Sequence, residues 1–186
     1  EWFVLLKAPS AWRILVPVPQ TLDDKAIKSN DYVSDIFRRV LNSSDPIETI
    51  HRTIYRVHQR VVNKMRYGRI MLAGDSAHLN NPLGGFGMNG GLHDAWNLAE
   101  KLDGIINHKK DEDLLNLYDR QRRTVMNDFI QKQTIRNKKM IEETGDANYS
   151  SEWMRMRNLH ENENERRDYM LRQSMTQSLI NEAAIK

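Results

Sequence analysis

The stretch GRIMLAGDSAHLNNPLGGFGMNGGLHDAWNLAEKL, residues 68–102, decides which fold we expect for this chain. It begins with an apolar run, Ile70–Ala73, whose lack of polar alternation predicts a strand buried on both faces, as in layered α/β domains. A glycine-rich loop follows, and then apolar residues recur at spacings of three and four, which predicts a helix with one apolar face. That face comprises Leu92, Ala95, Trp96, Ala99 and Leu102, whereas Asp94, Asn97 and Lys101 are expected to point elsewhere. A strand, a glycine-rich loop and a helix in this order are typical of a cofactor site.

The loop between the predicted strand and helix is rich in glycine, which permits positive φ and lets the backbone approach a ligand closely. Its glycines are Gly84, Gly85, Gly87, Gly90 and Gly91. The first turn of the following helix leaves backbone N–H groups unpaired at the positive end of the helix dipole, which favours negative charge by roughly 0.3–1 kcal/mol when exposed. The loop therefore predicts a flat or anionic ligand that is rich in hydrogen-bond acceptors.

Residues 85–90 also match G-x-G-x-x-G, the pyrophosphate loop of a Rossmann dinucleotide fold. That loop follows its strand almost immediately, whereas nine residues separate Asp75 from Gly85. A second strand that ends in an acidic residue is not predicted in residues 103–139. A nicotinamide-dependent oxidoreductase that uses this loop is therefore an alternative function, and a non-catalytic assembly module is another.

The same stretch resembles the second flavin motif of the FAD-dependent aromatic hydroxylases, the p-hydroxybenzoate hydroxylase-like flavoprotein monooxygenases. The residues that carry the resemblance are Gly74-Asp75, Ala77-His78, the flavin-ring loop PLGGFGMN at 82–89, Asp94-Ala95 and Asn97-Leu98. Two flanking runs, Tyr55–Val57 and Leu117–Arg123, are similar to the phenol and 3-hydroxyphenylpropionate hydroxylase branch. The resemblance covers most of residues 1–140.

The resemblance implies that FAD carries the chemistry, so no catalytic side chain is expected. Asp75 would contact the ribityl chain of FAD, and the backbone N–H groups of Gly87, Met88 and Asn89 would face the flavin ring. The implied cofactor-binding set is Gly74, Asp75, Pro82, Gly85, Gly87, Met88 and Asn89. In such an enzyme FAD is reduced by NADH or NADPH, and O2 is used to hydroxylate a phenolic substrate. The simpler alternatives are that Asp75 only ends a strand and that the glycines mark close packing.

A metal site is not expected. The chain has no cysteine, and its six histidines show no HExxH or comparable ligand spacing. We expect His78 to be a hydrogen-bonded structural histidine rather than a contact to the phosphate or ribose end of a cofactor.

The expected fold class is α/β, or α+β within this fragment: the C-terminal part of an FAD/NAD(P)-binding-like fold. Residues 1–66 would be the latter part of an antiparallel substrate-domain sheet, with strands near 2–6, 12–16 and 53–62. A helix at about 30–41 would be capped by Asn30 or Asp31. Residues 67–104 would be the FAD-binding segment, and residues 105–186 a helical region that is loosely held after about 145.

Composition sets outer limits on function. The 186 residues have a net charge of +3 with basic and acidic residues interspersed, unlike a nucleic-acid-binding stripe. Charged residues make up 28% of the chain, and no apolar run approaches membrane-spanning length, so we expect a cytoplasmic protein. Since nothing before Gly68 supplies a pyrophosphate loop, we expect the C-terminal half of a longer protein, with weak or absent FAD binding alone. The substrate and the oligomeric state stay open.

Overall fold

The computed structural model describes residues 2–43, 45–142 and 146–186. It is a mixture of helix and sheet, and it divides into two compact units, Glu1–Arg56 and Val57–Lys186. The predicted domain boundary at residues 66 and 67 therefore falls within the second unit.

The first unit is a hairpin followed by two helices. Strands β1 (Val4–Lys7) and β2 (Trp12–Leu15) pair antiparallel, which confirms the predicted pair of neighbouring strands. Helices α1 (Asp24–Ile27) and α2 (Asn30–Leu41) follow, and α2 has the bounds that its apolar spacing predicts.

The cap of α2 lies one residue earlier than expected. Ser29 precedes the helix in an extended conformation, and its side chain accepts a hydrogen bond from the Tyr32 backbone N–H at 3.2 Å. The prediction of Asn30 or Asp31 as the cap is therefore wrong. A serine hydroxyl satisfies a first-turn N–H as well as either of those side chains would, so the three polar residues in a row made the choice ambiguous.

The strands of the second unit are very short. β3 (Arg60–Val61) pairs antiparallel with β6 (His78–Leu79), and β4 (Arg66–Tyr67) pairs antiparallel with β5 (Ile70–Met71). A single 3₁₀ turn, η1 (Gly74–Ser76), lies between β5 and β6. Of the strand predicted at 70–73, only Ile70 and Met71 form β5, and residues 72 and 73 connect it to η1.

Two strand predictions fail in this region. Ile70 is 65% exposed, although the apolar run at 70–73 predicted burial on both faces, because β5 has only the β4 strand beside it and the core beneath it. Of the predicted strand at 53–62 only β3 is formed, and Tyr55 and Val57 are exposed. Their alternation requires a sheet face to pack against, and the described residues do not supply one.

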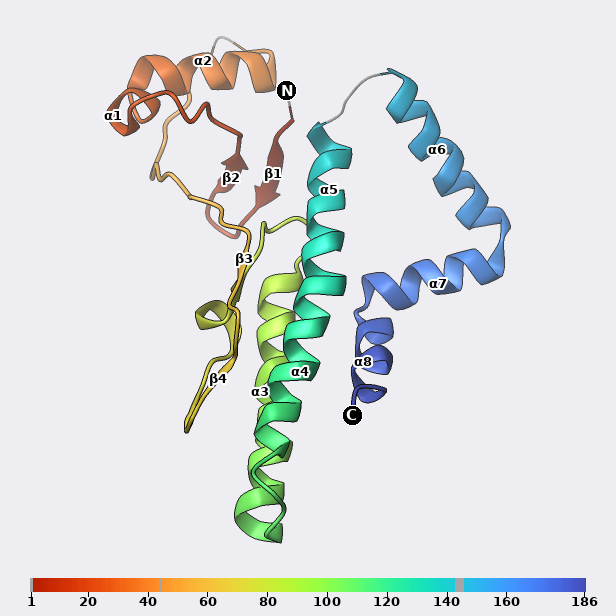
Figure 1. Cartoon of the computed structure of the whole chain (residues 1–186). Coiled ribbons are helices and arrows are strands. Elements are labelled where there is room, and N and C mark those ends of the chain that lie inside the picture. The colour runs from red at the N-terminus through yellow and green to blue at the C-terminus, as the bar shows by residue number, and fades with distance from the viewer. Residues whose placement is uncertain (1, 44, 143–145) are drawn as a thin grey trace. The chain divides into compact units, whose positions relative to one another are not determined.

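Helices form the greater part of the second unit (Figure 1). α3 (Phe86–His108) lies beside α4 (Leu114–Val125), which continues through a π-helix, η2 (Met126–Gln131), into α5 (Lys132–Glu142). No helix among the described residues is both long and apolar enough to cross a membrane.

The C-terminal helices are α6 (Asp146–Glu161), α7 (Glu163–Gln173) and α8 (Thr176–Ala183). α8 packs against α4, and the Gln121 side chain donates to the backbone carbonyls of Glu182 and Ile185 at 3.2 and 3.0 Å. At α8 the structure therefore differs from the expected loosely held tail. The anchoring residues are polar, so apolar periodicity could not reveal them.

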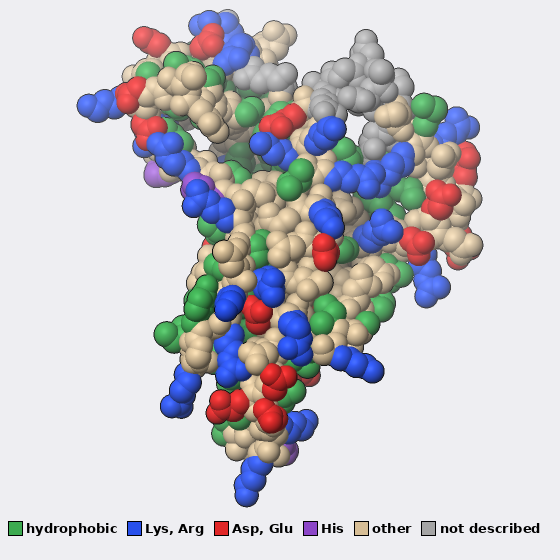
Figure 2. Space-filling view, viewed as in Figure 1, with side chains coloured by type: hydrophobic (Ala, Val, Ile, Leu, Met, Phe, Trp, Pro, Cys, Tyr) green, Lys and Arg blue, Asp and Glu red, His purple; other side chains and the backbone are tan. Residues whose placement is uncertain are grey.

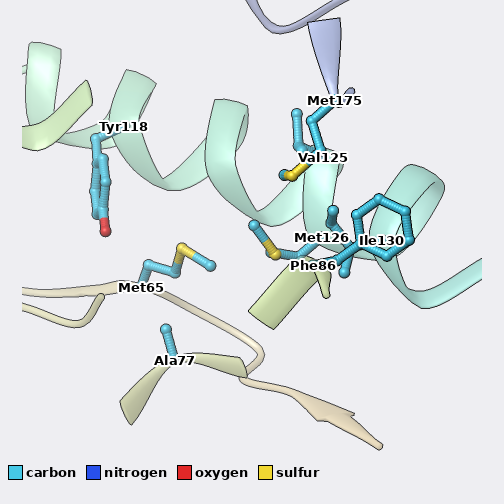
Figure 3. Close-up of a cluster of buried hydrophobic side chains, with 8 residues drawn as sticks. All are labelled: Met65, Ala77, Phe86, Tyr118, Val125, Met126, Ile130 and Met175. Carbon is cyan, nitrogen blue, oxygen red and sulfur yellow. The ribbon is translucent and has the colours of Figure 1, made fainter. Parts of the chain in front are cut away.

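One apolar core joins these elements, and Figure 3 shows its side chains. The core comprises Met65, Ala77, Phe86, Tyr118, Val125, Met126, Ile130 and Met175. Phe86, the first residue of α3, also packs edge-on against Phe129 with ring centroids 6.4 Å apart. The glycine-rich loop is thus tied to the core at the point where it enters α3.

The two faces of α3 are the reverse of those that its apolar spacing predicts. Asp94 and Asn97 are buried, at 0% and 6% exposure, whereas Leu92 and Trp96 are 59% and 71% exposed. The expected assignment of Asp94, Asn97 and Lys101 to the outer face is therefore wrong. The reason is that their partners come from α4 and α8, which are distant in sequence.

Charged side chains are mixed on the surface. Figure 2 shows Lys and Arg intermingled with Asp and Glu over the face in view.

Candidate functional site

The site begins at the η1 turn, which lies directly against α3. A Cβ at Gly91 would come within 3.2 Å of the Gly74 Cα, so a side chain at Gly91 would push the turn and the helix slightly apart. The Ser76 hydroxyl closes the turn by donating to the Ala73 carbonyl at 2.8 Å. Asp75 projects from this turn, is exposed, and has no hydrogen bond or ion pair with any described residue. Its carboxylate is therefore available to a ligand.

The start of α3 forms the second part of the site. Gly85 is the N-cap, with φ +70, and its N–H donates to the Pro82 carbonyl at 3.0 Å. No side chain caps this helix, so the N–H groups of Phe86, Gly87 and Met88 lack intrahelical partners. Nothing lies within 4 Å of the position where a Gly85 Cβ would be. The helix thus presents unpaired donors beside an open backbone surface.

The remaining predicted cofactor-binding residues surround this helix start. Met88 is 76% exposed, and Asn89 is also exposed, with its Nδ2 donating to the Gly85 carbonyl at 2.9 Å. Gly87 is half-buried and faces the Asn80 side chain. The predicted residues therefore lie in two places, the η1 turn and the loop with the start of α3, and the η1 turn contacts α3 at Gly91, beyond the first turn of the helix.

A buried carboxylate lies behind the η1 turn. Asp94 accepts hydrogen bonds from the Gly74 N–H at 2.9 Å, from the Arg122 Nε at 2.6 Å, and lies 2.6 Å from the His78 Nε2. Burial alone would raise the pKa of Asp94, but hydrogen bonds from His78 and Arg122 and the Arg122 charge outweigh burial and lower it. His78 is thus the hydrogen-bonded structural histidine that the sequence led us to expect, and Asp94 holds the turn that carries Asp75.

Arg122 extends this arrangement into the second half of the chain. It is fully buried, forms an ion pair with Glu182 of α8, and donates to the Gly90 carbonyl at 3.2 Å. Lys101 donates to Asn97 and Gln121 at 2.6 and 2.8 Å, and burial lowers the pKa of Lys101. The buried charge of Arg122 is compensated by Asp94 and Glu182, whereas the Lys101 ammonium donates to two neutral amide oxygens.

Sequence reasoning missed this network. Arg122 is buried and Arg123 pairs with Asp119 at 3.2 Å, whereas Arg120 is exposed. One signal could have found it. Asp94, Asn97 and Lys101 follow one another at spacings of three and four, which is as good a helical stripe as the apolar one.

The geometry fits the FAD contacts that were expected. The open side of Gly85 admits a flat ring without a Cβ in the way, and the uncapped N–H groups of α3 suit the acceptor atoms at the edge of such a ring. The Asp75 carboxylate, which has no partner among the described residues, can accept hydrogen bonds from hydroxyl groups. No cluster of three or more His, Asp or Glu side chains that could hold a metal ion occurs in the part of the chain that the structure describes.

Comparison with known proteins gives a consistent result. The family model described as FAD binding domain matches residues 9–133. The chain is 36% identical over 118 residues to 6-hydroxy-3-succinoylpyridine 3-monooxygenase of Pseudomonas putida (strain DSM 28022 / S16), covering 63% of this chain and 30% of that protein. It is 32% identical over 152 residues to para-nitrophenol 4-monooxygenase of Pseudomonas sp. (strain WBC-3), covering 79% and 37%.

Solved structures share this fold. The crystal structure of p-nitrophenol 4-monooxygenase from Pseudomonas putida DLL-E4 matches with a TM-score of 0.78 and 26% identity, covering 92% of this chain and 45% of that one. The chain spans less than half the length of each of these three proteins.

Proposed function

The chain belongs to the FAD binding domain family of flavin-dependent aromatic monooxygenases, and from this premise we propose that it supplies the ribityl and ring contacts of an FAD site. The observation that carries the proposal is an open helix start at Gly85 together with a carboxylate, Asp75, that has no partner among the described residues. The turn that carries Asp75 is held by the buried Asp94 of the same helix.

Asp75 would bind the ribityl chain, because an exposed carboxylate with no hydrogen-bond partner among the described residues is a strong acceptor for hydroxyl groups. The unpaired N–H groups of Gly87 and Met88 would donate to the pyrimidine edge of the flavin ring, with the dipole of the 23-residue α3 behind them. The expected N–H of Asn89 is not free for this role, because Asn89 is the fourth residue of the helix and its N–H is directed to the Gly85 carbonyl. A positive dipole end stabilises negative charge that develops on the ring, by about 2 kcal/mol in partly buried geometry. When bound, FAD supplies the electron transfer and oxygen chemistry.

Gly74 and Pro82 would act by shaping the site. Gly74 adopts a positive φ of +59 in the η1 turn and its N–H donates to Asp94, so the adjacent Asp75 has a fixed position. The Pro82 carbonyl holds the Gly85 N–H, which fixes the N-cap. Neither residue needs to touch a reacting atom.

The substrate class follows from the relatives by analogy. Their names specify hydroxylated or nitrated aromatic rings, including para-nitrophenol and 3-(3-hydroxy-phenyl)propionate. We propose a phenolic ring as substrate, O2 as the oxidant and NADH or NADPH as the reductant. Because the chain spans less than half of these relatives, the pyrophosphate contacts and the substrate pocket would be completed by other parts of such a protein.

A graft tests this proposal. The aligned region of para-nitrophenol 4-monooxygenase of Pseudomonas sp. (strain WBC-3) would be replaced by this chain, and the purified protein analysed by absorption spectroscopy and NAD(P)H oxidation. We expect about one FAD per chain, and NAD(P)H oxidation that a phenolic substrate stimulates. The unmodified host enzyme gives the reference flavin content.

Two outcomes would contradict the proposal. One is a graft that circular dichroism shows to be folded but that stays colourless after addition of FAD. The other is specific binding of NADH without flavin, which would favour a nicotinamide-dependent oxidoreductase.

A further inference from the structure

We propose that Gln131, Thr134 and Asn137 are positioning residues that fix residues 79–84, the segment that leads from β6 into the flavin-ring loop and is called the limb here. The proposal rests on the proposed function and assigns a role to the helical region that follows the predicted FAD-binding segment. These three side chains lie at the end of the η2 π-helix and in α5, and each makes a polar contact with the limb or with its partner Gln59.

The contacts run along the limb in order. The Gln131 Nε2 donates to the Leu79 carbonyl at 3.0 Å, at the start of the limb. The Asn137 Nδ2 donates to the Leu83 carbonyl at 3.1 Å, near its end. Asn137 is itself oriented by Gln133, whose Nε2 donates to the Asn137 Oδ1 at 2.9 Å. Side chains from the end of η2 and from α5 thus hydrogen-bond to both ends of the limb.

Asn81 is the central point of the limb. It is buried, and its Nδ2 donates to the Thr134 carbonyl and to the Gln59 Oε1, both at 3.0 Å. Its Oδ1 accepts from the Leu83 N–H at 3.1 Å. Gln59 is in turn fixed by the Thr134 hydroxyl, which accepts from its Nε2 at 2.8 Å. Every polar group of the Asn81 side chain is therefore satisfied, and its orientation is defined.

Gly84, the last residue of the limb, shows how closely the limb approaches α5. Gly84 has φ +106, and a Cβ there would lie 2.7 Å from the Asn137 Nδ2 and 2.3 Å from the Phe86 ring. Gly84 therefore faces inward against α5, whereas Gly85 faces open space. The limb ends at the residue where the loop turns from the protein interior toward the proposed ring.

The π-helix explains why these side chains point at the loop. A π-helix holds one extra residue in a turn, and one residue corresponds to about 100° of rotation in an α-helix. An uninterrupted α-helix through 126–131 would therefore rotate Thr134 and Asn137 away from the limb. π-bulges are rare in proteins, and those that occur are often found at functional sites, which agrees with a positioning role.

Hydrogen exchange of the full 186-residue chain tests the proposal without a cofactor. In Asn137→Asp the side chain keeps its size and its bond from Gln133, but its carboxylate cannot donate to the Leu83 carbonyl. We expect the amides of Leu83 and Gly85 to exchange about 3- to 10-fold faster, the change that corresponds to one lost hydrogen bond. Amides in the middle of α3 should be unaffected.

The matched control is Asn127→Ala. Asn127 lies in the π-helix that precedes α5 and is exposed. Its side chain donates to the carbonyl of Arg123, four residues earlier, rather than to the limb. Exchange of the limb amides should stay within twofold of the parent chain. The proposal is overturned if Asn137→Asp and Asn127→Ala give the same limb exchange, or if Asn137→Asp accelerates exchange equally throughout residues 57–142.

A second arm connects the limb to the flavin. In the grafted enzyme, Asn137→Asp should weaken FAD binding about 3- to 10-fold while Asn127→Ala leaves it unchanged. A graft that binds no FAD would contradict the proposed function, whereas the exchange result on the chain would still decide the positioning role. Unchanged FAD affinity together with faster limb exchange would overturn the link between the limb and the ring.

Discussion

The two faces of α3 differ in chemistry and in surroundings. The face turned toward α4 and α8 is polar and buried, with Asp94 at 0% exposure and Asn97 at 6%. The opposite face is apolar and open, with Met88 at 76% and Trp96 at 71% exposure. Apolar character therefore does not decide which face of α3 is buried. The buried face is the one for which other elements supply partners, and these partners are Arg122, Gln121 and Glu182.

The contrast also separates two kinds of residue around the proposed cofactor site. Residues on the inner side, such as Asp94 and Gly84, hold the loop in place, and their loss should cost stability. Residues on the outer side, such as Asp75 and Gly85, should matter to a ligand and little to the fold.

Removing the buried carboxylate should have the largest effect. Asp94→Ala leaves Arg122 without one of its two acidic partners and frees the Gly74 N–H, so the free energy of unfolding should fall by about 3–5 kcal/mol. Urea unfolding of the chain at pH 7 measures this loss. The matched control is Asp128→Ala, which removes an exposed pair with Lys132 and should cost about 0.3–0.5 kcal/mol. Equal losses in the two variants would contradict the account.

The stabilisation from Asp94 should also depend on pH. Since its pKa is lowered in the folded chain, the carboxylate stabilises the fold above its unfolded pKa of about 3.9 and loses this effect as the pH falls through the folded value. The difference in unfolding free energy between the parent and Asp94→Ala should therefore be full at pH 7 and decrease only below about pH 4. A difference that is already lost at pH 6 would be inconsistent with a lowered pKa.

Two adjacent glycines extend the comparison to the loop. Gly84→Ala adds a Cβ against the Phe86 ring at φ +106 and should reduce the unfolding free energy by about 2–4 kcal/mol. Gly85→Ala meets no atom and should cost about 1 kcal/mol for its positive φ alone. Thermal unfolding of the two variants compares them directly, and a larger loss for Gly85→Ala would reverse the assignment of inner and outer sides.

Changes on the exposed apolar face should have the smallest effect. Leu92→Gln and Trp96→Gln alter side chains that are 59% and 71% exposed, so the unfolding free energy of this chain should change by no more than about 0.5 kcal/mol. Urea unfolding again provides the measurement. A loss above 2 kcal/mol from either variant would mean that this face is packed in the chain.

Local patterns predicted part of this fold. The hairpin of β1 and β2, the bounds of α2 and the helix after the glycine-rich loop follow from apolar runs and spacing that involve only neighbouring residues. The FAD assignment followed from a dense motif at 74–89. Such features depend on short stretches of sequence and therefore survive without tertiary information.

The failures all depend on long-range contacts. The burial of Asp94 requires Arg122 and Glu182. Arg122 lies 28 residues after Asp94 in the sequence, and Glu182 lies 60 residues after Arg122. The exposure of Ile70 reflects which layers are present beside β5, and the π-helix at 126–131 has no local sequence signature that we could use. Spacing gives the period of a helix but not the identity of its neighbours.

Asp75 and the start of α3 are proposed to form the flavin contacts of this chain. The Kd for FAD of the grafted monooxygenase, measured by quenching of flavin fluorescence with and without Asp75→Ala, tests this assignment. We predict binding weaker by about 10- to 100-fold, because hydrogen bonds to a charged acceptor contribute about 1.5–3 kcal/mol. Asp128→Ala, which changes another exposed carboxylate away from the site, should leave the Kd unchanged. An Asp75→Ala protein that binds FAD as tightly as the unsubstituted graft would contradict the assignment.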